Sequence, residues 1–318
     1  MIGSVLVLGG TGFVGRGLCD ALVERSGAGG APLVVASRQP ERAKYLLPLP
    51  TLRVVQADVH DEATLRRLVR GHDAVVNLVA ILHGSPAAFE HVHAELPRKL
   101  VRACNDAGVT RVVHVSALGA APDGPSHYLR TKGLGEAVIA HSGLAFSVLR
   151  PSVIFGAHDR FMNLFASLQA KLPVVPLAGA QARFQPVWVQ DVAQAIVRCL
   201  DDRTTVGTTY ECAGPQTYTL AQLVRAAGRW SGHERAVLSL PQALGRLQAL
   251  AMEWLPGPTL MSRDNLDSMR APNVAGAVLP GLTALGITPA TLDSIVPQYL
   301  APGQGLARFD PWRARHGG

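Results

Sequence analysis

Three side chains near the middle of the sequence have types and spacing that suit proton transfer. Tyr128 and Lys132 are four residues apart in a stretch with a helical pattern, so they share one face of that helix. A lysine ammonium beside a phenol favours the phenolate, and we expect Lys132 to lower the pKa of Tyr128 toward the working range. Ser116 follows a strand-like run and offers a hydroxyl to the same substrate oxygen. This set predicts Ser116, Tyr128 and Lys132 as catalytic residues; the alternative for Ser116 is a strand-end hydroxyl that bonds only backbone.

The N-terminal glycines predict a phosphate-binding turn. Gly9, Gly12 and Gly15 are spaced by three residues, between the apolar run 4–8 and a helical pattern. Gly9 can make the turn, Gly12 leaves room for a pyrophosphate, and Gly15 lets the helix pack on the strand. The pyrophosphate of a dinucleotide would bind the unpaired N–H groups at the positive end of the helix. A tight turn without a ligand is the alternative.

The end of the second predicted strand indicates which dinucleotide binds. An acidic residue usually ends this strand in NAD sites, whereas here it ends in Ser37 and Arg38. The guanidinium of Arg38 suits a 2′-phosphate, so we predict NADP(H) over NAD(H). Arg16 is a further candidate for the same phosphate or for the pyrophosphate, and Arg42 for the 2′-phosphate; the alternative for both is a surface residue. Asp58 ends the third strand and lies either beside the adenine or at a helix N-cap.

The elements that position these residues alternate between strand and helix. Apolar strand-like runs occupy residues 33–36, 52–57, 74–79, 111–115 and 146–149, and helical patterns such as 89–107 and 128–141 lie between them. This alternation predicts an α/β fold with a Rossmann-type, doubly wound parallel sheet. After Pro151 the rhythm changes, although a helix over 189–200 and a strand over 209–212 return to the sheet. The predicted domains are therefore a NADP(H)-binding domain, 1–155 with 184–213, and a smaller α-rich substrate or partner lobe, 156–183 with 214–318.

Composition and charge indicate which classes of molecule the protein binds. The 318 residues carry a net charge of +7, and the arginines are scattered rather than interleaved with aromatic residues. We therefore expect a small-molecule substrate and no nucleic acid. The first strand begins almost at Met1 and no apolar run reaches membrane-spanning length, so we expect a cytoplasmic protein without a signal peptide.

Cysteines and histidines give no sign of a metal site. The four cysteines lie far apart within apolar segments, which predicts buried, reduced thiols. His93 and His114 have no metal-ligand company at suitable spacing, so we expect packed or surface histidines and no metal.

One segment suggests a surface role. Leu240, Leu244, Leu247, Ala251 and Trp254 form an apolar stripe in a predicted helix over 240–255. This stripe could contact a membrane or a respiratory complex, or could pack as a lid over a substrate cleft.

Together these motifs resemble the extended short-chain dehydrogenase/reductase superfamily. The resemblance rests on residues 9–15, Asp58, Ser116, Tyr128 with Lys132, and 150–156. Within that superfamily, residues 89–93, 128–136, 159–163, 185–189, 262–264 and 273–274 look like the NADPH-binding accessory subunit of respiratory complex I and its bacterial relatives.

The resemblance implies a tightly held NADPH, with Arg38 near its 2′-phosphate and Pro151 to Ile154 beside the nicotinamide. It also implies that His93 replaces an asparagine common in the wider superfamily, which argues against full sugar-epimerase or dehydratase chemistry. The expected cofactor-binding set is Gly9, Thr11, Gly12, Phe13, Val14, Gly15, Arg16, Ser37, Arg38, Asp58, Val59, Leu78, Val79, Ala80, Tyr128, Lys132, Pro151, Val153 and Ile154.

Two functions follow from these expectations. The first is an NADP(H)-dependent oxidoreductase that moves hydride to or from a carbonyl or quinone-like molecule, with Tyr128 as the general acid or base. The second is a non-catalytic, NADPH-holding accessory or assembly protein, associated with a respiratory complex or with the inner face of a membrane.

Overall fold

The structure is a computed structural model that describes residues 3–27, 30–254 and 261–304. The chain divides into two compact units. Unit 1 comprises Met1–Pro151, Val189–Cys212 and Gly276–Thr288, and unit 2 comprises Ser152–Trp188, Ala213–Ala275 and Pro289–Gly318.

A seven-stranded parallel sheet forms the centre of unit 1. Its spatial order is β11-β6-β5-β4-β1-β2-β3, and every neighbouring pair is parallel. The strands are β1 (Val5–Leu8), β2 (Leu33–Ser37), β3 (Leu52–Gln56), β4 (Ala74–Asn77), β5 (Arg111–Val115), β6 (Ala145–Pro151) and β11 (Thr208–Cys212). β1, β4 and β5 are buried along their whole length, in keeping with their mainly apolar sequences; the buried polar residues in them are Asn77, Arg111 and His114.

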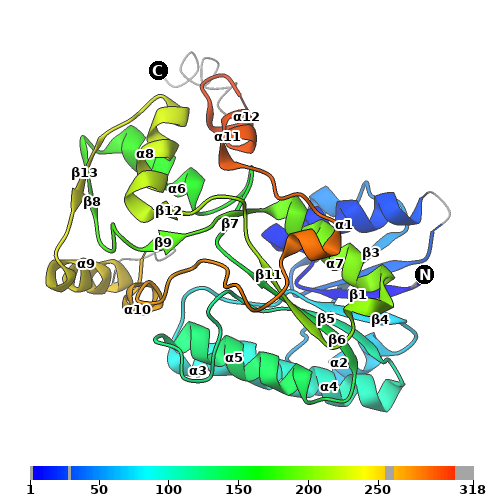
Figure 1. The fold of residues 1–318 in the computed structure, drawn as a ribbon. Helices are drawn as coiled ribbons and strands as arrows, with labels where there is room; N and C mark the ends of the chain where they lie inside the picture. The colour runs from blue at the N-terminus through cyan, green and yellow to red at the C-terminus, as the bar shows by residue number, and fades with distance from the viewer. Residues whose placement is uncertain (1–2, 28–29, 255–260, 305–318) are drawn as a thin grey trace. The chain divides into compact units, whose positions relative to one another are not determined.

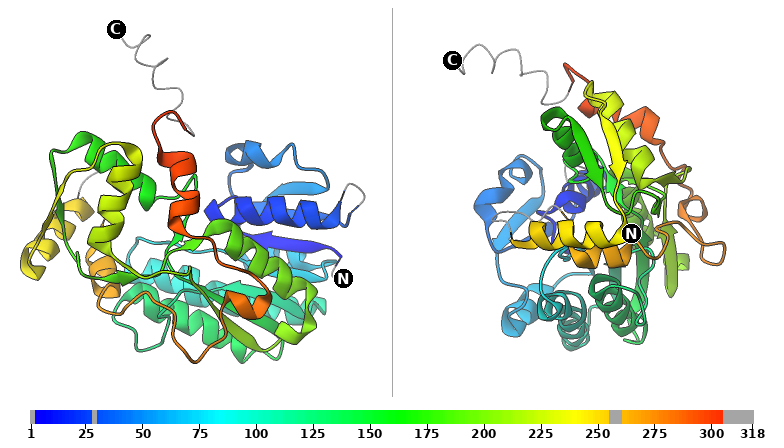
Figure 2. Two further views of the ribbon diagram at one scale, coloured as in Figure 1. Left: turned by 45° about the horizontal axis from the view of Figure 1, so that its top comes forward. Right: turned by 90° about the vertical axis from the view of Figure 1, so that its left-hand side faces the viewer.

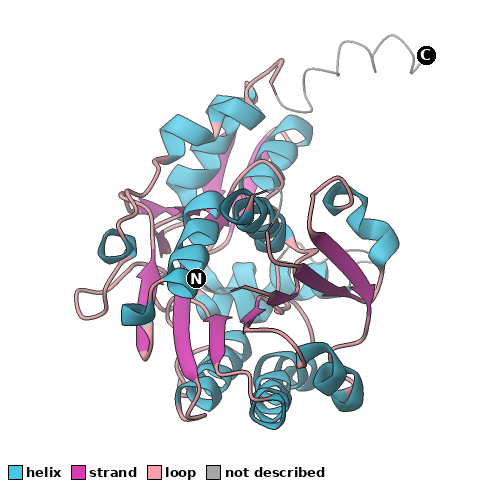
Figure 3. Ribbon diagram, turned by 90° about the vertical axis from the view of Figure 1, so that its right-hand side faces the viewer, coloured by secondary structure: helices cyan, strands magenta, loops and turns pink. Residues whose placement is uncertain are grey.

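Helices cover both faces of this sheet (Figures 1 and 3). α1 (Phe13–Ser26) packs against α7 (Val189–Asp201) on one face, and α2 (Glu62–Val69), α4 (Leu96–Ala107) and α5 (His127–Ala140) pack together on the other. The short elements are the 3₁₀ helices η1 (Pro40–Leu46), η3 (Arg203–Thr205) and η4 (Leu282–Leu285), and the one-turn helix α3 (Pro86–Glu90). The predicted Rossmann-type fold is confirmed.

The helix expected over 89–107 contains a π-helical turn that sequence periodicity missed. α3 passes into η2, a π-helical segment over His91–Glu95, before α4 begins. Pro97 in the first turn of α4 has no N–H for the carbonyl of His93, four residues earlier. That carbonyl faces Gly135 of α5, where a Cβ would lie only 1.9 Å from its oxygen. Proline and glycine thus together accommodate the wider turn.

Unit 2 is built from short strand pairs and helices (Figure 2). β7 (Ile154–Phe155) pairs with β10 (Val187–Trp188), β9 (Arg183–Phe184) with β12 (Tyr218–Thr219), and β8 (Val174–Leu177) with β13 (Ala236–Ser239). Its helices are α6 (Met162–Lys171), α8 (Leu220–Ser231), α9 (Gln242–Trp254), α10 (Arg263–Ser268), α11 (Leu292–Ile295) and α12 (Pro297–Leu300). Its core gathers the buried side chains Phe155, Met162, Leu220, Leu223 and Val296.

The compact units differ from the predicted domains at residues 152–155, 184–188 and 213, which belong to unit 2, and at the longer segment 276–288. The sequence analysis placed this segment in the smaller lobe, whereas it belongs to unit 1. Glu211, on the edge strand β11, explains the difference: its side chain accepts a hydrogen bond from the Gly276 N–H, and its own N–H donates to the Pro280 carbonyl at 2.9 Å. The roles assigned to the two parts stay predictions.

All four cysteines are buried and free of disulfides, as expected. Burial raises the pKa of each thiol, to about 12 for Cys19 and Cys104. Over the described ranges, no helix is both long and apolar enough to span a membrane.

Candidate functional site

The turn between β1 and α1 has the geometry of an anion site. Gly9 adopts a φ of 80°, and a Cβ there would lie 3.1 Å from the Leu78 backbone, so a glycine is required. Gly15 packs so closely that a Cβ would lie 2.4 Å from the Gly10 carbonyl oxygen. Gly12 is the N-cap of α1, with no side-chain cap and no acidic residue in the first turn. The first N–H groups of α1, from Phe13 onward, therefore remain available to an anion.

Two arginines lie near this turn. Arg38 follows β2 and is exposed, while the buried Ser37 hydroxyl accepts a hydrogen bond from the Gln39 N–H at 3.2 Å. Arg16, on α1, places its guanidinium carbon 3.7 Å from the ring centroid of Tyr45. The side chain of Arg42 lies outside the described part of the chain.

Tyr45 is a component that the sequence analysis missed. Its hydroxyl donates to the Thr11 carbonyl at 2.6 Å, which connects η1 to the glycine turn. Its ring supports Arg16 by a cation–π contact. A single tyrosine in a polar segment has no distinctive sequence signal, so its position could be recognised only from the fold.

Asp58 is not a helix N-cap, so that alternative is wrong. The N-cap of α2 is Asp61, whose side chain accepts from the Thr64 N–H. The exposed Asp58 carboxylate instead accepts from the His60 N–H at 3.0 Å, and the following residue, Val59, is buried. Its proposed place beside an adenine stays a prediction.

The loop after β4 is fixed by a buried amide. Asn77 accepts from the Val79 N–H at 3.2 Å, and its amide nitrogen lies 3.2 Å from Nδ1 of His114 on the adjacent strand β5. Leu78 and Val79 are half-buried and Ala80 is exposed. The predicted loop residues therefore follow directly from a strand end, next to Gly9.

Ser116, Tyr128 and Lys132 all belong to unit 1, in β5 and α5 or just beyond them. Ser126 caps α5 and places Tyr128 in its first turn. The buried Lys132 ammonium donates to the Val115 carbonyl at 2.6 Å, immediately before Ser116. The Ser116 hydroxyl and Nε2 of His114 are buried and make no hydrogen bond within the described residues. Such unsatisfied polar atoms are compatible with a bound ligand.

The expected lowering of the Tyr128 pKa is not what the structure gives. Burial raises the pKa of Tyr128 to about 12. Burial also lowers the pKa of Lys132 to about 8, and the nearby Glu136 carboxylate opposes this shift. The Lys132 ammonium donates to the Val115 carbonyl, and burial is the cause of the raised Tyr128 pKa.

His93 is a packed histidine, as expected, and it braces the site. Its Nε2 accepts from the Ile81 N–H at 3.1 Å, so Nδ1 carries the proton and donates to the Thr131 hydroxyl at 3.0 Å. Burial, aided by the Lys132 charge, lowers the pKa of His93 to about 3. The neutral ring therefore joins the loop after β4 to the helix that carries Tyr128.

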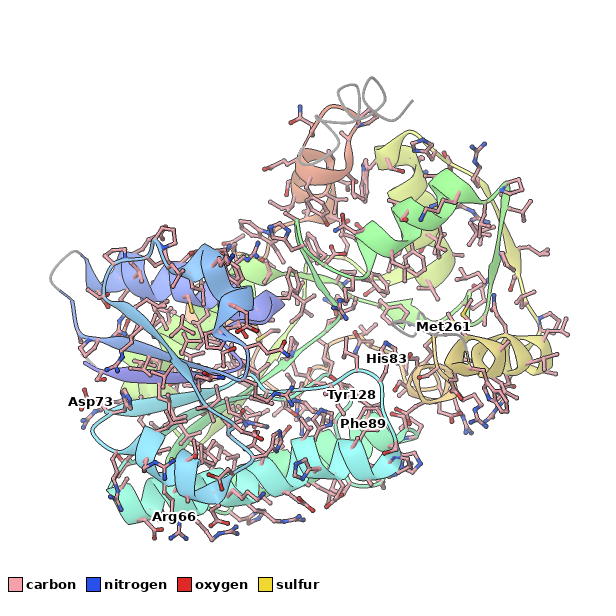
Figure 4. The ribbon with its side chains drawn as sticks, turned by 180° about the vertical axis from the view of Figure 1, so that it is seen from behind. Arg66, Asp73, His83, Phe89, Tyr128 and Met261 are labelled. Atoms are coloured by element: carbon pink, nitrogen blue, oxygen red, sulfur yellow. The ribbon has the colours of Figure 1, made fainter. Side chains whose placement is uncertain are left out.

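Aromatic rings surround Tyr128. Its ring packs edge-on against Phe89, with centroids 6.2 Å apart, and against His93, with centroids 5.4 Å apart. Figure 4 shows Phe89 next to Tyr128. The π-helical turn thus supplies part of the wall around the phenol.

The far end of α5 is tied to β6 by an ion pair. Arg150 binds the Glu136 carboxylate through two nitrogens, at 2.6 Å and 2.9 Å. The next residue, Pro151, accepts from the Leu118 N–H at 2.9 Å, which fixes the loop that follows Ser116. These contacts hold the strand end and the helix together.

The remaining predicted cofactor residues lie in unit 2. The Val153 N–H donates to the Asn273 side chain at 2.9 Å, and Ile154 lies in β7 opposite Val187. Asp159, from one of the motifs behind the resemblance, is buried and accepts from the Gly156 and Phe161 N–H groups and from the Tyr299 hydroxyl. Asp159 therefore has a structural task within this unit.

No metal centre is found among residues 3–27, 30–254 and 261–304, where no group of three or more potential ligands gathers. The glycine turn, the uncapped helix start and the buried polar atoms fit a dinucleotide instead.

A parallel Rossmann sheet with this turn defines a dinucleotide-binding protein. The sequence model of the NAD(P)H-binding family matches residues 9–203, and the chain belongs to that family.

The relatives include a mitochondrial subunit and a reductase. Subunit 9 of the NADH dehydrogenase [ubiquinone] 1 alpha subcomplex, mitochondrial, from Mus musculus is 30% identical over 90% of this chain and 77% of its own length. A ceramide reductase from Caulobacter vibrioides is 28% identical over 75% of this chain and 74% of its own.

Solved structures agree on the fold. The UDP-glucose 4-epimerase of Thermotoga maritima, solved with UDP-glucose, superimposes with a TM-score of 0.68 at 18% identity, covering 94% of this chain and 97% of the epimerase. At this identity the similarity shows the fold alone.

Proposed function

We propose that this protein is an NADP(H)-dependent oxidoreductase that reduces a carbonyl or quinone-like small molecule. The observation that carries the proposal is the arrangement of Ser116, Tyr128 and Lys132 on two consecutive elements of unit 1, with the Ser116 hydroxyl buried and unpartnered. The reductase among the relatives supports this choice of reaction.

The cofactor would be held by the elements described above. The first turn of α1 would bind the pyrophosphate, and Arg38, with Arg16 braced by Tyr45, would bind the 2′-phosphate. Lys132 would bind the nicotinamide ribose. Bound NADPH supplies a hydride to the carbonyl carbon of the substrate.

Side chains of this protein would orient the substrate and supply the proton that its oxygen receives. Ser116 donates a hydrogen bond that orients the substrate oxygen, and Tyr128 transfers its phenolic proton to that oxygen as the alcohol forms. A raised pKa keeps Tyr128 protonated at neutral pH, as a general acid must be. Solvent would then return the proton to the phenolate that remains.

Replacing the phenol tests this proposal. The reduced nicotinamide absorbance is followed with NADPH and a panel of aldehydes, ketones and quinones. Tyr128→Phe should reduce turnover about 100-fold or more while the NADPH Kd changes little, because the ring is kept and only the acid is lost. Tyr218→Phe, at a half-exposed tyrosine of unit 2, serves as the matched control. Undiminished turnover in Tyr128→Phe would contradict the assignment.

A second candidate is an accessory or assembly protein that holds NADPH without turning it over. The mitochondrial subunit among the relatives favours this candidate. In that case the protein would be cytoplasmic and would bind a respiratory complex at the inner face of the membrane. Tight NADPH binding with no oxidation by the whole substrate panel would favour this function over the oxidoreductase.

A further inference from the structure

Helix α9 of unit 2 has its apolar side turned outward. Its buried residues are Gly245 and Ala249, and Gly245 packs on Ala178, which follows β8. Leu244, Leu247 and Trp254 are 53%, 62% and 84% exposed. The helix therefore packs through its small residues and presents its large apolar ones to the surroundings, the reverse of an ordinary surface helix.

The outward arc of α9 contains no charged side chain. At 3.6 residues per turn, one arc of about 120° collects six apolar positions. They are Ala243, Leu244, Leu247, Leu250, Ala251 and Trp254. The charged residues Arg246 and Glu253 flank this arc, and each is paired: Arg246 lies 3.7 Å from Asp267, and Glu253 lies 3.0 Å from Arg263.

The neighbouring strand pair continues this apolar surface. In β8 and β13, Val174 lies opposite Ala236 and Pro176 opposite Leu238, and all four are exposed. The alternate residues Val175 and Leu177 fill the core of unit 2. α9 follows β13 directly, and Gln248 donates to the Pro176 carbonyl at 3.3 Å, so helix and strands are adjacent (Figure 1).

Positive charge accompanies this surface. The sequence of unit 2 contains twelve Lys and Arg against seven Asp and Glu, which gives +5 of the net +7 of the chain. Lys171 and Arg235 are exposed just before β8 and β13, at the same end of the parallel pair. Glu253 on α9 and Asp267 on α10 are each paired with an arginine.

We propose that α9 and the outer face of β8–β13 dock on a membrane surface that contains anionic lipid. The uncharged arc, with Trp254 at its end, would enter the boundary between headgroups and acyl chains, and the basic residues would meet the phosphates. Indole side chains favour this boundary. The inference is independent of the proposed function, because it uses no residue of the dinucleotide site.

Vesicle flotation of the full-length protein tests the proposal. The wild type is mixed with vesicles of phosphatidylcholine alone or of phosphatidylcholine with phosphatidylglycerol, at low and high salt. The triple variant Leu244→Ser, Leu247→Ser, Trp254→Ser removes the apolar arc. The matched control, Leu47→Ser, Val206→Ser, Val278→Ser, removes three exposed apolar side chains of unit 1. Circular dichroism and NADPH binding verify that each variant is folded.

The expected result is binding to the phosphatidylglycerol vesicles that weakens with salt, and a loss of about tenfold or more in the α9 variant but not in the control. Two results would overturn the proposal: wild-type protein that stays with neither vesicle, or an α9 variant that floats as well as the wild type. Self-association abolished by the α9 substitutions, without vesicle binding, would assign the surface to a second copy of the chain instead.

Discussion

Arg38 follows β2, whereas Arg16 lies on α1 and has a packed support. The Tyr45 ring holds its guanidinium, and the Tyr45 hydroxyl is bonded to Thr11. Arg38 is exposed, so its charge is available to a phosphate. We therefore expect the proposed preference for NADPH over NADH to depend mainly on Arg38.

Arg38→Ala should weaken NADPH binding by roughly 10- to 100-fold and leave NADH binding nearly unchanged, because a charge-assisted hydrogen bond to the 2′-phosphate is lost. Calorimetric titration with both nucleotides measures this difference. Arg53→Ala, at an exposed arginine of β3, is a suitable control. Equal losses for the two nucleotides would show that Arg38 does not read the phosphate.

His93 makes stability depend on pH. Its folded pKa of about 3 lies below the ordinary value of 6.5, so the unfolded chain binds the proton more readily. Its contribution to stability is complete above pH 6.5 and is lost as the pH falls toward 3, by at most about 1.4 kcal/mol per pH unit.

His93→Gln should flatten this dependence, since glutamine can accept from Ile81 and donate to Thr131 without titrating. Urea unfolding at pH 7 and pH 5 compares the two proteins. The buried His114, whose pKa is lowered chiefly by burial, remains in both proteins. An unchanged difference between the two pH values would exclude His93 as the source.

At the scale of elements, the contact between the π-helical turn and α5 fixes the wall around Tyr128. Gly135→Ala would place a methyl group against the His93 carbonyl, at a distance no real contact has. We expect a loss of about 1–3 kcal/mol in the free energy of unfolding.

Gly17→Ala provides the opposite case. This helical glycine in α1 faces only the flexible Gln190 side chain, at 3.2 Å, so alanine should be neutral or stabilising by up to about 1 kcal/mol. Denaturant unfolding of Gly135→Ala and Gly17→Ala measures the change in the free energy of unfolding, which should be negative for the first variant and zero or positive for the second. Similar stabilities would mean that the close approach at Gly135 relaxes freely.

The elements also show what the sequence could predict. Hydrophobic runs located the strands, because each central strand is buried on both faces, and the glycine spacing located the turn. The π-helical turn was missed because the apolar periodicity continues past Pro97, although a proline inside a helix signals an interrupted hydrogen bond. Asp58 and Asp61 are equally good caps on paper, and only the backbone geometry at Thr64 separates them. Long-range contacts such as Tyr45 with Arg16, or Glu211 with Gly276, leave no periodic signal.

At the scale of the whole molecule, ligand binding should act on stability through unit 1. NADPH at 100 times its Kd should add about 2.7 kcal/mol to the free energy of unfolding if it binds only the folded chain. The midpoint temperature of thermal unfolding should then rise by several degrees. The Arg38→Ala variant should need a higher NADPH concentration for the same rise. No shift at saturating NADPH would contradict a dinucleotide site at the glycine turn.

The buried thiols have a practical consequence for following this molecule in solution. All four cysteines are enclosed and resist ionisation, so a maleimide dye or spin label has no native point of attachment. A single cysteine introduced at an exposed position, for example Trp254→Cys or Val278→Cys, would become the one reactive handle. Reporter groups could thus be attached to either unit without first removing any natural residue.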